Sequence, residues 1–193
     1  MRQTIIFNDD ERVECWEVAK RVTKHLSNVN NDRYNRRHIH SGRFPANQRY
    51  MGMLGELAVA KFLGKPFNTR QEVSKEIGSS DGKINGWTYD VKTTGHQKGW
   101  LVVPSNMNGA TQSDVYIAAY CPTSKENKTT TAEIVGWLWH NEICKPINIS
   151  NEFKSKPFVV KTGLRSIFTL ADATWAASEM QSVNEATHCA YQE

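Results

Sequence analysis

The chain lacks the sequence features of membrane, secreted and repeat proteins. No apolar run approaches the roughly 18 residues that a membrane-spanning helix needs, and no signal-peptide pattern opens the sequence. The four cysteines are scattered without a Cys-x-x-Cys pair, which favours reduced thiols over a disulfide framework. Internal repeats and long low-complexity tracts are also missing. We therefore expect a globular cytoplasmic protein without a membrane partner.

Length and charge narrow the class of protein further. The 193 residues suit one large core and are few for two domains. Lysine and arginine number 24 against 20 acidic residues, so the formal charge of +4 is mildly basic. That balance is compatible with a nucleic-acid partner but does not identify one. We expect residues 1–46 to form an N-terminal helix and a basic segment, and residues 47–193 to form the core of the same compact domain.

The dipeptide Asn85-Gly86 predicts a β-hairpin within residues 81–94. Asn-Gly tolerates the positive φ angles of a type I′ turn, and a two-residue turn of this type fixes the register of both strands. In that register Asp81 lies opposite Asp90, so the two carboxylates share one face of the hairpin. Like charges that face each other destabilise a hairpin unless something neutralises them. A hard divalent cation would neutralise them, because it takes carboxylate oxygens as ligands.

The strand after the turn also carries a lysine on this face. Lys92 lies two residues beyond Asp90, and side chains two apart on a strand point the same way. Lys92 alone could balance Asp90, which leaves open the alternative of a solvated polar face. The opposite face is predicted to join the core and carries Ile84, Trp87, Tyr89 and Val91.

A helix carrying a third acid is predicted upstream. Apolar side chains recur at helical spacing through residues 48–64, and Gly64 with a proline soon after it is a typical C-terminal stop. Glu56 stands among small and apolar neighbours on this helix. Gly52 and Gly55 flank it, although each costs about 1 kcal/mol in a helix interior relative to alanine. Two such glycines indicate that the helix closely approaches another element.

These acids and the lysine together resemble a known pattern. An acidic residue on a helix, then an aspartate, then Asp-x-Lys on the next strand is similar to the PD-(D/E)xK nuclease superfamily. The matching residues are Glu56, Asp81, Asp90 and Lys92. Ser80 precedes Asp81 where the proline that names the superfamily would stand. The resemblance covers roughly residues 47–140.

The resemblance implies an α/β fold with a restriction-endonuclease-like core, in which helices flank a central mixed sheet of four to five strands. The apolar runs at 100–104, 115–120 and 133–139 resemble the later strands of small phage and prokaryotic members. The implied activity is metal-dependent hydrolysis of DNA phosphodiester bonds. We expect an endonuclease rather than an exonuclease, acting in the host cytoplasm if a phage encodes it.

The resemblance also implies a role for each residue of the site. Asp81 and Asp90 would be the principal ligands of Mg²⁺, for which Mn²⁺ would substitute. The Val91 carbonyl would be a further ligand, and Glu56 would complete the site or orient a metal-bound water. Lys92 would orient the attacking water or stabilise the developing negative charge.

A basic segment at residues 33–49 fits a DNA substrate. It contains no acid, and arginine forks match phosphate oxygens. Its arginines are Arg33, Arg36, Arg37, Arg43 and Arg49. A solvated surface loop remains the alternative. Lys98 and His96, in the loop directly after the Asp-x-Lys strand, are a second candidate contact to a phosphate.

The N-terminal residues predict a separate helix. Asn8, with an acid at Glu11, forms a capping pattern before the helix, which we expect to end in a turn at residues 27–32. Its apolar stripe would contain Val13, Trp16, Ala19, either Val22 or Thr23, and Leu26. This stripe is expected to pack on the core or to form a homodimer surface.

The C-terminal third predicts three smaller elements. Residues 140–144 are expected to form a short helix, residues 158–161 an edge strand, and residues 171–181 a helix that packs on the core.

Three rival functions use different residues. A zinc site would need paired ligands, and only His140 and Cys144 are suitably spaced among the candidates His38, His40, His140, Cys144, His188 and Cys189. A nuclease of the HNH type would use the His38 region, but its other expected residues are not at workable spacing. The third rival is a nuclease-fold module that binds without cleaving, either on DNA or as a phage-encoded inhibitor of a host defence protein. The full set of Glu56, Asp81, Asp90 and Lys92 favours the enzyme.

Overall fold

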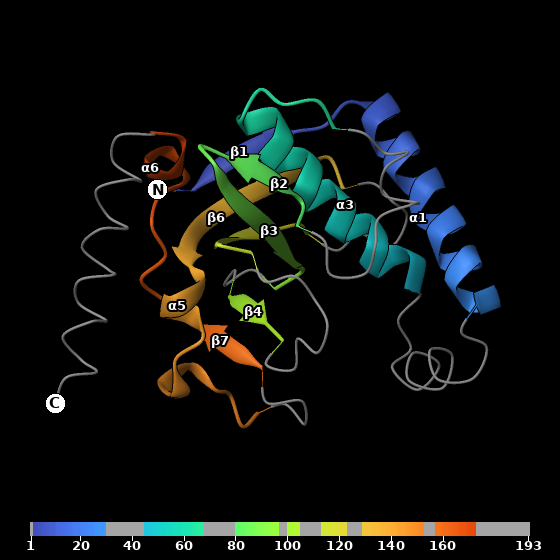
Figure 1. Ribbon diagram of the computed structural model, residues 1–193. Coiled ribbons are helices and arrows are strands. Elements are labelled where there is room, and N and C mark those ends of the chain that lie inside the picture. Colours follow the sequence, from blue (N-terminus) through green and yellow to red (C-terminus); the bar gives the residue numbers. More distant parts are fainter. Residues whose placement is uncertain are drawn as a thin grey trace, which may run out of the picture.

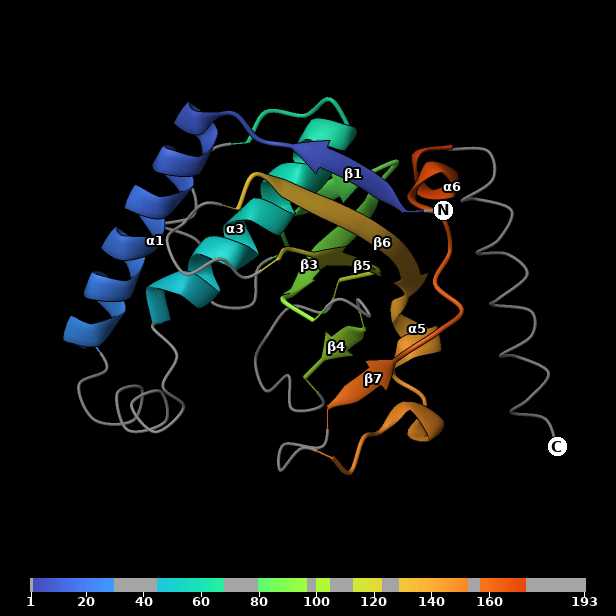
Figure 2. The same cartoon turned by 180° about the vertical axis from the view of Figure 1, so that it is seen from behind.

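The computed structural model describes residues 2–29, 45–67, 80–96, 100–104, 113–122, 129–152 and 157–172. Figure 1 shows a curled sheet crossed by helices on one face, and Figure 2 shows the same arrangement from behind. The described helices are α1 (Asp9–Val29), α3 (Pro45–Phe62), α5 (His140–Ile143), η1 (Pro146–Asn148) and α6 (Ile167–Ala171). The protein therefore belongs to the mixed α/β class.

A five-stranded mixed sheet forms the centre of the fold. It contains β1 (Gln3–Ile6), β2 (Gly82–Ile84), β3 (Trp87–Thr94), β5 (Val115–Tyr120) and β6 (Thr131–Trp139). Their spatial order is β1-β6-β5-β3-β2, and only β3 and β5 run parallel among these neighbours. A second ladder pairs β4 (Leu101–Val103) with β7 (Phe158–Val160) in antiparallel fashion.

Each face of the main sheet packs against its own hydrophobic core. Alternate strand residues such as Tyr89, Val91 and Ile117 pack toward α3 and α6. The residues between them, such as Tyr116 and Ala118, pack against the β4–β7 ladder and α5. Because side chains alternate along a strand, each face of β3 has its own chemical environment.

Helix α1 begins where the sequence predicts. The side chain of Asn8 accepts a hydrogen bond from the Glu11 N–H, and Glu11 accepts one from the Asn8 N–H, each at 2.8 Å. This reciprocal pair is the capping box that the pattern predicts. Trp16 packs edge-on against Tyr50 of α3 with ring centroids 5.6 Å apart, so α1 covers α3 and does not contact the sheet through this residue.

Three details of the N-terminal prediction were wrong. Val13 is 60% exposed, because the buried stripe of α1 is centred on Cys15, Val18 and Ala19. The helix continues through Val29, past the turn expected at residues 27–32. Strand β1 was not predicted at all, because only its pairing with β6 stabilises such a short segment.

The remaining elements largely follow the sequence. All the predicted strands and helices in the described part are present, β5 with the predicted ends 115–120 and the others with shifted ends. These others are the strands predicted at 100–104, 133–139 and 158–161 and the helices predicted at 48–64 and 140–144. The segment at 100–104 differs in one respect, because β4 joins β7 and lies outside the main sheet. The helix expected at 171–181 lies mostly outside the described residues. Within the described part of the chain, every helix is too short or too polar to cross a membrane.

Candidate metal centre on the hairpin

The Asn85-Gly86 hairpin forms in the predicted register. Asn85 has φ of 49° and Gly86 has φ of 88°, the left-handed pair that a type I′ turn requires. The ladder pairs Ile84 with Trp87 and continues to Gly82 opposite Tyr89. The local sequence alone therefore brings the residue before Gly82 alongside the residue after Tyr89, which are Asp81 and Asp90.

Asp81 directly precedes the first residue of strand β2. Its N–H donates to the Tyr89 carbonyl at 2.8 Å, and its carboxylate accepts a hydrogen bond from the Val91 N–H at 2.6 Å. The side chain thus replaces the missing ladder partner of Val91. In an extended strand the N–H and C=O of one residue point to the same side, so the Val91 carbonyl also points toward this edge.

Asp90 lies against Asp81 and is largely withdrawn from water. Its side chain is 17% exposed. Burial, together with the neighbouring Asp81 carboxylate, raises the pKa of Asp90 to about 6, while Lys92 acts in the opposite direction. A buried pair of carboxylates favours either a shared proton or a cation between them. Lys92 forms an ion pair with Asp90 on the same face of the strand, as the spacing predicts.

Strand β5 provides the floor of this site. Tyr116 lies directly beside Asp90 in the parallel register and is fully buried. Burial and the nearby Asp90 carboxylate raise the pKa of Tyr116 to about 12, so the phenol stays protonated at neutral pH. The Lys92 ammonium lies 5.9 Å from the centre of its ring. This side of Asp90 and Lys92 is therefore closed to solvent.

Asp114 fixes the start of the same strand pair. Its carboxylate accepts hydrogen bonds from the Thr88 N–H at 2.8 Å and the Thr88 hydroxyl at 2.7 Å. The Asp114 N–H in turn donates to the Thr88 hydroxyl at 3.0 Å. These contacts hold β3 and β5 together two residues before Asp90. Neither Asp114 nor Tyr116 was predicted to be a site residue. The sequence around Asp90 does not reveal which strand runs parallel to β3, because that strand lies more than 20 residues away in the chain.

Glu56 lies on helix α3, which packs on the face of β3 opposite to Asp90. There Gly55 lies against the side chain of Thr93. Among the described residues, no three His, Cys, Asp or Glu side chains gather closely enough to hold a metal ion. The convergence of Glu56 on Asp81 and Asp90 stays a prediction.

The predicted DNA contacts lie mostly outside the described part of the chain. This applies to Arg33, Arg36, Arg37, Arg43 and Lys98. Arg49 is half-buried on α3, and His96 is exposed just beyond the end of β3.

The paired zinc candidates do meet, but as an uncharged pair. The Cys144 sulfur lies 3.6 Å from Nδ1 of His140. Burial raises the pKa of the Cys144 thiol, while burial lowers the pKa of His140 against a smaller opposing effect of Asp114. This combination favours a neutral thiol and a neutral imidazole over a thiolate ligand. The other zinc candidates, His38, His40, His188 and Cys189, lie outside the described residues.

Comparison of the chain with family models, with curated proteins and with solved structures gave no match. The chemistry of the site must therefore be argued from its own residues.

Proposed function

We propose that the protein is a metal-dependent deoxyribonuclease with a restriction-endonuclease-like core, of the PD-(D/E)xK superfamily, that cuts DNA internally. One observation carries the proposal: Asp81 and Asp90 lie side by side on the hairpin with Lys92 on the same face. The hydrogen bond from the Val91 N–H to Asp81 and the Asp90–Lys92 ion pair help to hold the strands, but two adjacent carboxylates also repel each other. Two such carboxylates beside a lysine are suited to phosphodiester hydrolysis with a divalent cation.

The pair of carboxylates fits a hard divalent cation. Mg²⁺ typically binds one or two carboxylates and keeps several waters, so it does not require a third acid from the protein. The raised pKa of Asp90 reflects repulsion and burial that a cation would relieve. Asp81 and Asp90 would hold the ion, and the Val91 carbonyl at the same edge would be a further oxygen. When bound, the ion would supply neutralisation of phosphate charge and acidification of a water.

The protein's own groups account for the remaining requirements of hydrolysis. Lys92 is held beside Asp90 and over Tyr116, so its ammonium lies next to the expected position of the phosphate. There it orients the attacking water and stabilises charge that develops on the phosphate oxygens. The hydrogen bond from the Val91 N–H holds the Asp81 carboxylate in a fixed orientation. This description does not require Glu56.

Cleavage of plasmid and linear DNA in Mg²⁺, Mn²⁺ or EDTA tests the proposal. We expect cleavage with either metal, none with EDTA, and a loss of at least about 100-fold for Asp90→Asn and for Lys92→Ala. Lys83→Ala is the matched control, because Lys83 is an exposed lysine on the same face of the hairpin. Equal activity of wild type, Lys92→Ala and Lys83→Ala with every metal would remove the site from the reaction.

A second candidate function is a module that keeps this fold and binds DNA or a host defence protein without cleaving. It is favoured by the Asp90–Lys92 ion pair, which already balances one acid without a metal, and by the lack of a cluster of three metal ligands among the described residues. The same assay distinguishes the two functions. DNA binding without cleavage in any metal would favour the module.

A further inference from the structure

The outer face of the β4–β7 ladder forms a surface that the proposed catalytic site does not use. The ladder pairs Leu101 with Val160, and both side chains point inward to the second core. One step further along the same antiparallel register, Trp100 lies opposite Lys161. Side chains alternate along each strand, so Trp100 and Lys161 point outward together with Val159.

Trp100 lies at the centre of a stack of three groups. Its ring is 5.3 Å from the His96 ring, with an angle of 24° between the planes. The Lys161 ammonium lies 4.4 Å from the centre of the Trp100 ring, which is a close cation–π contact. Lys161 also forms a 3.1 Å ion pair with Glu152, although both side chains remain exposed, at 46% and 60%. An exposed pair of this kind is weak and easily exchanged for another anion.

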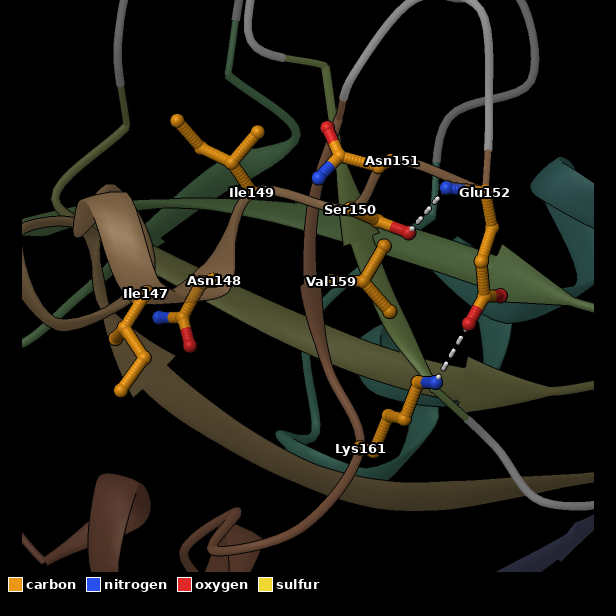
Figure 3. Close-up of a pocket in the computed structure, with 8 residues that line it drawn as sticks. All are labelled: Ile147, Asn148, Ile149, Ser150, Asn151, Glu152, Val159 and Lys161. Atoms are coloured by element: carbon orange, nitrogen blue, oxygen red, sulfur yellow. Dashed lines mark hydrogen bonds and ion pairs between the residues drawn. The ribbon is translucent and has the colours of Figure 1, made fainter.

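A groove of about 590 Å³ adjoins this stack. Figure 3 shows Val159 between Lys161 and the segment from Ile147 to Glu152, with the Glu152–Lys161 ion pair at one end of the groove. Its lining combines apolar side chains with amide, hydroxyl and charged groups. Ile147 is 89% exposed, which is unusual for so large an apolar side chain. Such a mixture suits a nucleobase, which has apolar faces and a polar edge.

We propose that this surface binds an unpaired nucleotide of a DNA strand. The base stacks on the His96–Trp100 pair or enters the groove beside Val159, and a phosphate replaces Glu152 as the partner of Lys161. The proposal rests on the proposed function, because it takes DNA as the ligand. Strand β3 leads from Asp90 to this surface: six residues at about 3.3 Å each separate Asp90 from His96 by about 20 Å. One DNA strand can therefore contact both places.

Binding to labelled oligonucleotides in EDTA tests this surface without cleavage. Three ligands are compared by fluorescence anisotropy: a mixed-sequence single strand, its duplex, and a strand of the same length whose sugars lack bases. We expect the single strand to bind best. His96→Ala and Lys161→Ala should each weaken that binding by about 5- to 100-fold, which is the range for losing one stacked base. Lys161→Ala should also make the binding less dependent on salt.

Lys20→Ala is a closely matched control. Lys20 is 45% exposed, forms an ion pair with Glu17 and lies 5.8 Å from the Trp16 ring, so it resembles Lys161 but lies on α1. We expect wild-type binding from this variant. Equal losses in Lys20→Ala and Lys161→Ala would overturn the proposal, since they would reflect net charge alone. Equal binding of the strands with and without bases would overturn it too, because no base would then be recognised.

The outcome is separate from that of the catalytic proposal. Base-dependent binding at His96 and Lys161 without cleavage in Mg²⁺ or Mn²⁺ would support this surface and refute the nuclease. Cleavage by wild type, combined with unchanged DNA binding in His96→Ala and Lys161→Ala, would support the nuclease and refute this surface. If the stack of His96, Trp100 and Lys161 only covers strands β4 and β7, we expect unchanged DNA binding in both variants.

Discussion

The two glycines beside Glu56 allow a sharp test of how α3 meets the sheet. A Cβ atom added at Gly55 would lie 2.0 Å from the Thr93 hydroxyl oxygen and 3.1 Å from the Thr93 Cβ. A Cβ atom added at Gly52 would meet nothing within 4 Å. Both residues lie inside the same helix, so both alanine substitutions gain about the same helix propensity, roughly 1 kcal/mol. The difference between the two variants therefore isolates the cost of the clash.

We expect Gly52→Ala to raise the free energy of unfolding by up to about 1 kcal/mol. Gly55→Ala must push α3 away from β3 or rotate Thr93, and overpacking of this kind costs about 1–3 kcal/mol. The two variants should differ by that amount, which corresponds to roughly 2–12 °C in melting temperature for a chain of this size. Urea and thermal unfolding followed by circular dichroism measure both quantities.

A result in which Gly55→Ala is as stable as Gly52→Ala would refute the close contact between α3 and β3. Because the Asp-x-Lys sequence lies on the same strand as Thr93, such a result would also question how firmly α3 positions the candidate metal centre. Thr93→Ala in the Gly55→Ala background is a useful second measurement. It removes the hydroxyl oxygen that lies closest to the added Cβ, so it should recover part of the lost stability.

The other predictions concern single contacts. In metal-free protein, the pKa of Asp90 is raised, so the folded state holds this proton more tightly than the unfolded state does. The stability that this group contributes is therefore lost as the pH rises from about 3.8 to about 6. Asp90→Asn should therefore raise the melting temperature at pH 8 but not at pH 3, and added Mg²⁺ should stabilise the wild type more than this variant. Asp114→Ala should cost about 1–3 kcal/mol in urea unfolding, because it leaves the Thr88 N–H without its acceptor; a loss below a few tenths would contradict the role given to this contact. Cys15 and Cys121 are both buried, and burial raises the pKa of Cys121 to about 12, so peptide mapping should find neither thiol labelled by an alkylating reagent until the protein unfolds.

The features that the sequence predicted best are those set by near neighbours in the chain. The Asn85-Gly86 turn fixes its own register, so the meeting of Asp81 with Asp90 and the position of Lys92 followed from local chemistry. The capping box of α1 is likewise local, since Asn8 and Glu11 are three residues apart. Such features need no knowledge of the rest of the fold.

The features that could not be predicted from the sequence depend on residues that are far apart in the chain. Tyr116 lies beside Asp90 only because β5 runs parallel to β3, and many pairings of these apolar strands are compatible with the sequence. The helix that carries Glu56 and the strand that carries Asp90 were correctly predicted, yet the face of β3 that α3 covers was not. Val13 shows the same limit, because the stripe of α1 that is buried depends on where α3 lies.

The two outer strands of the main sheet bear on how copies of the protein could associate. Strand β1 has four residues and β2 has three, and the Lys65 ammonium donates to the Lys83 carbonyl of β2. Short edge strands are poor templates for the addition of another strand, and so is an edge whose backbone carbonyl is bound by a lysine. A dimer of this protein is therefore expected to form through side-chain surfaces, and its solubility should not depend on a partner that protects the ends of the sheet.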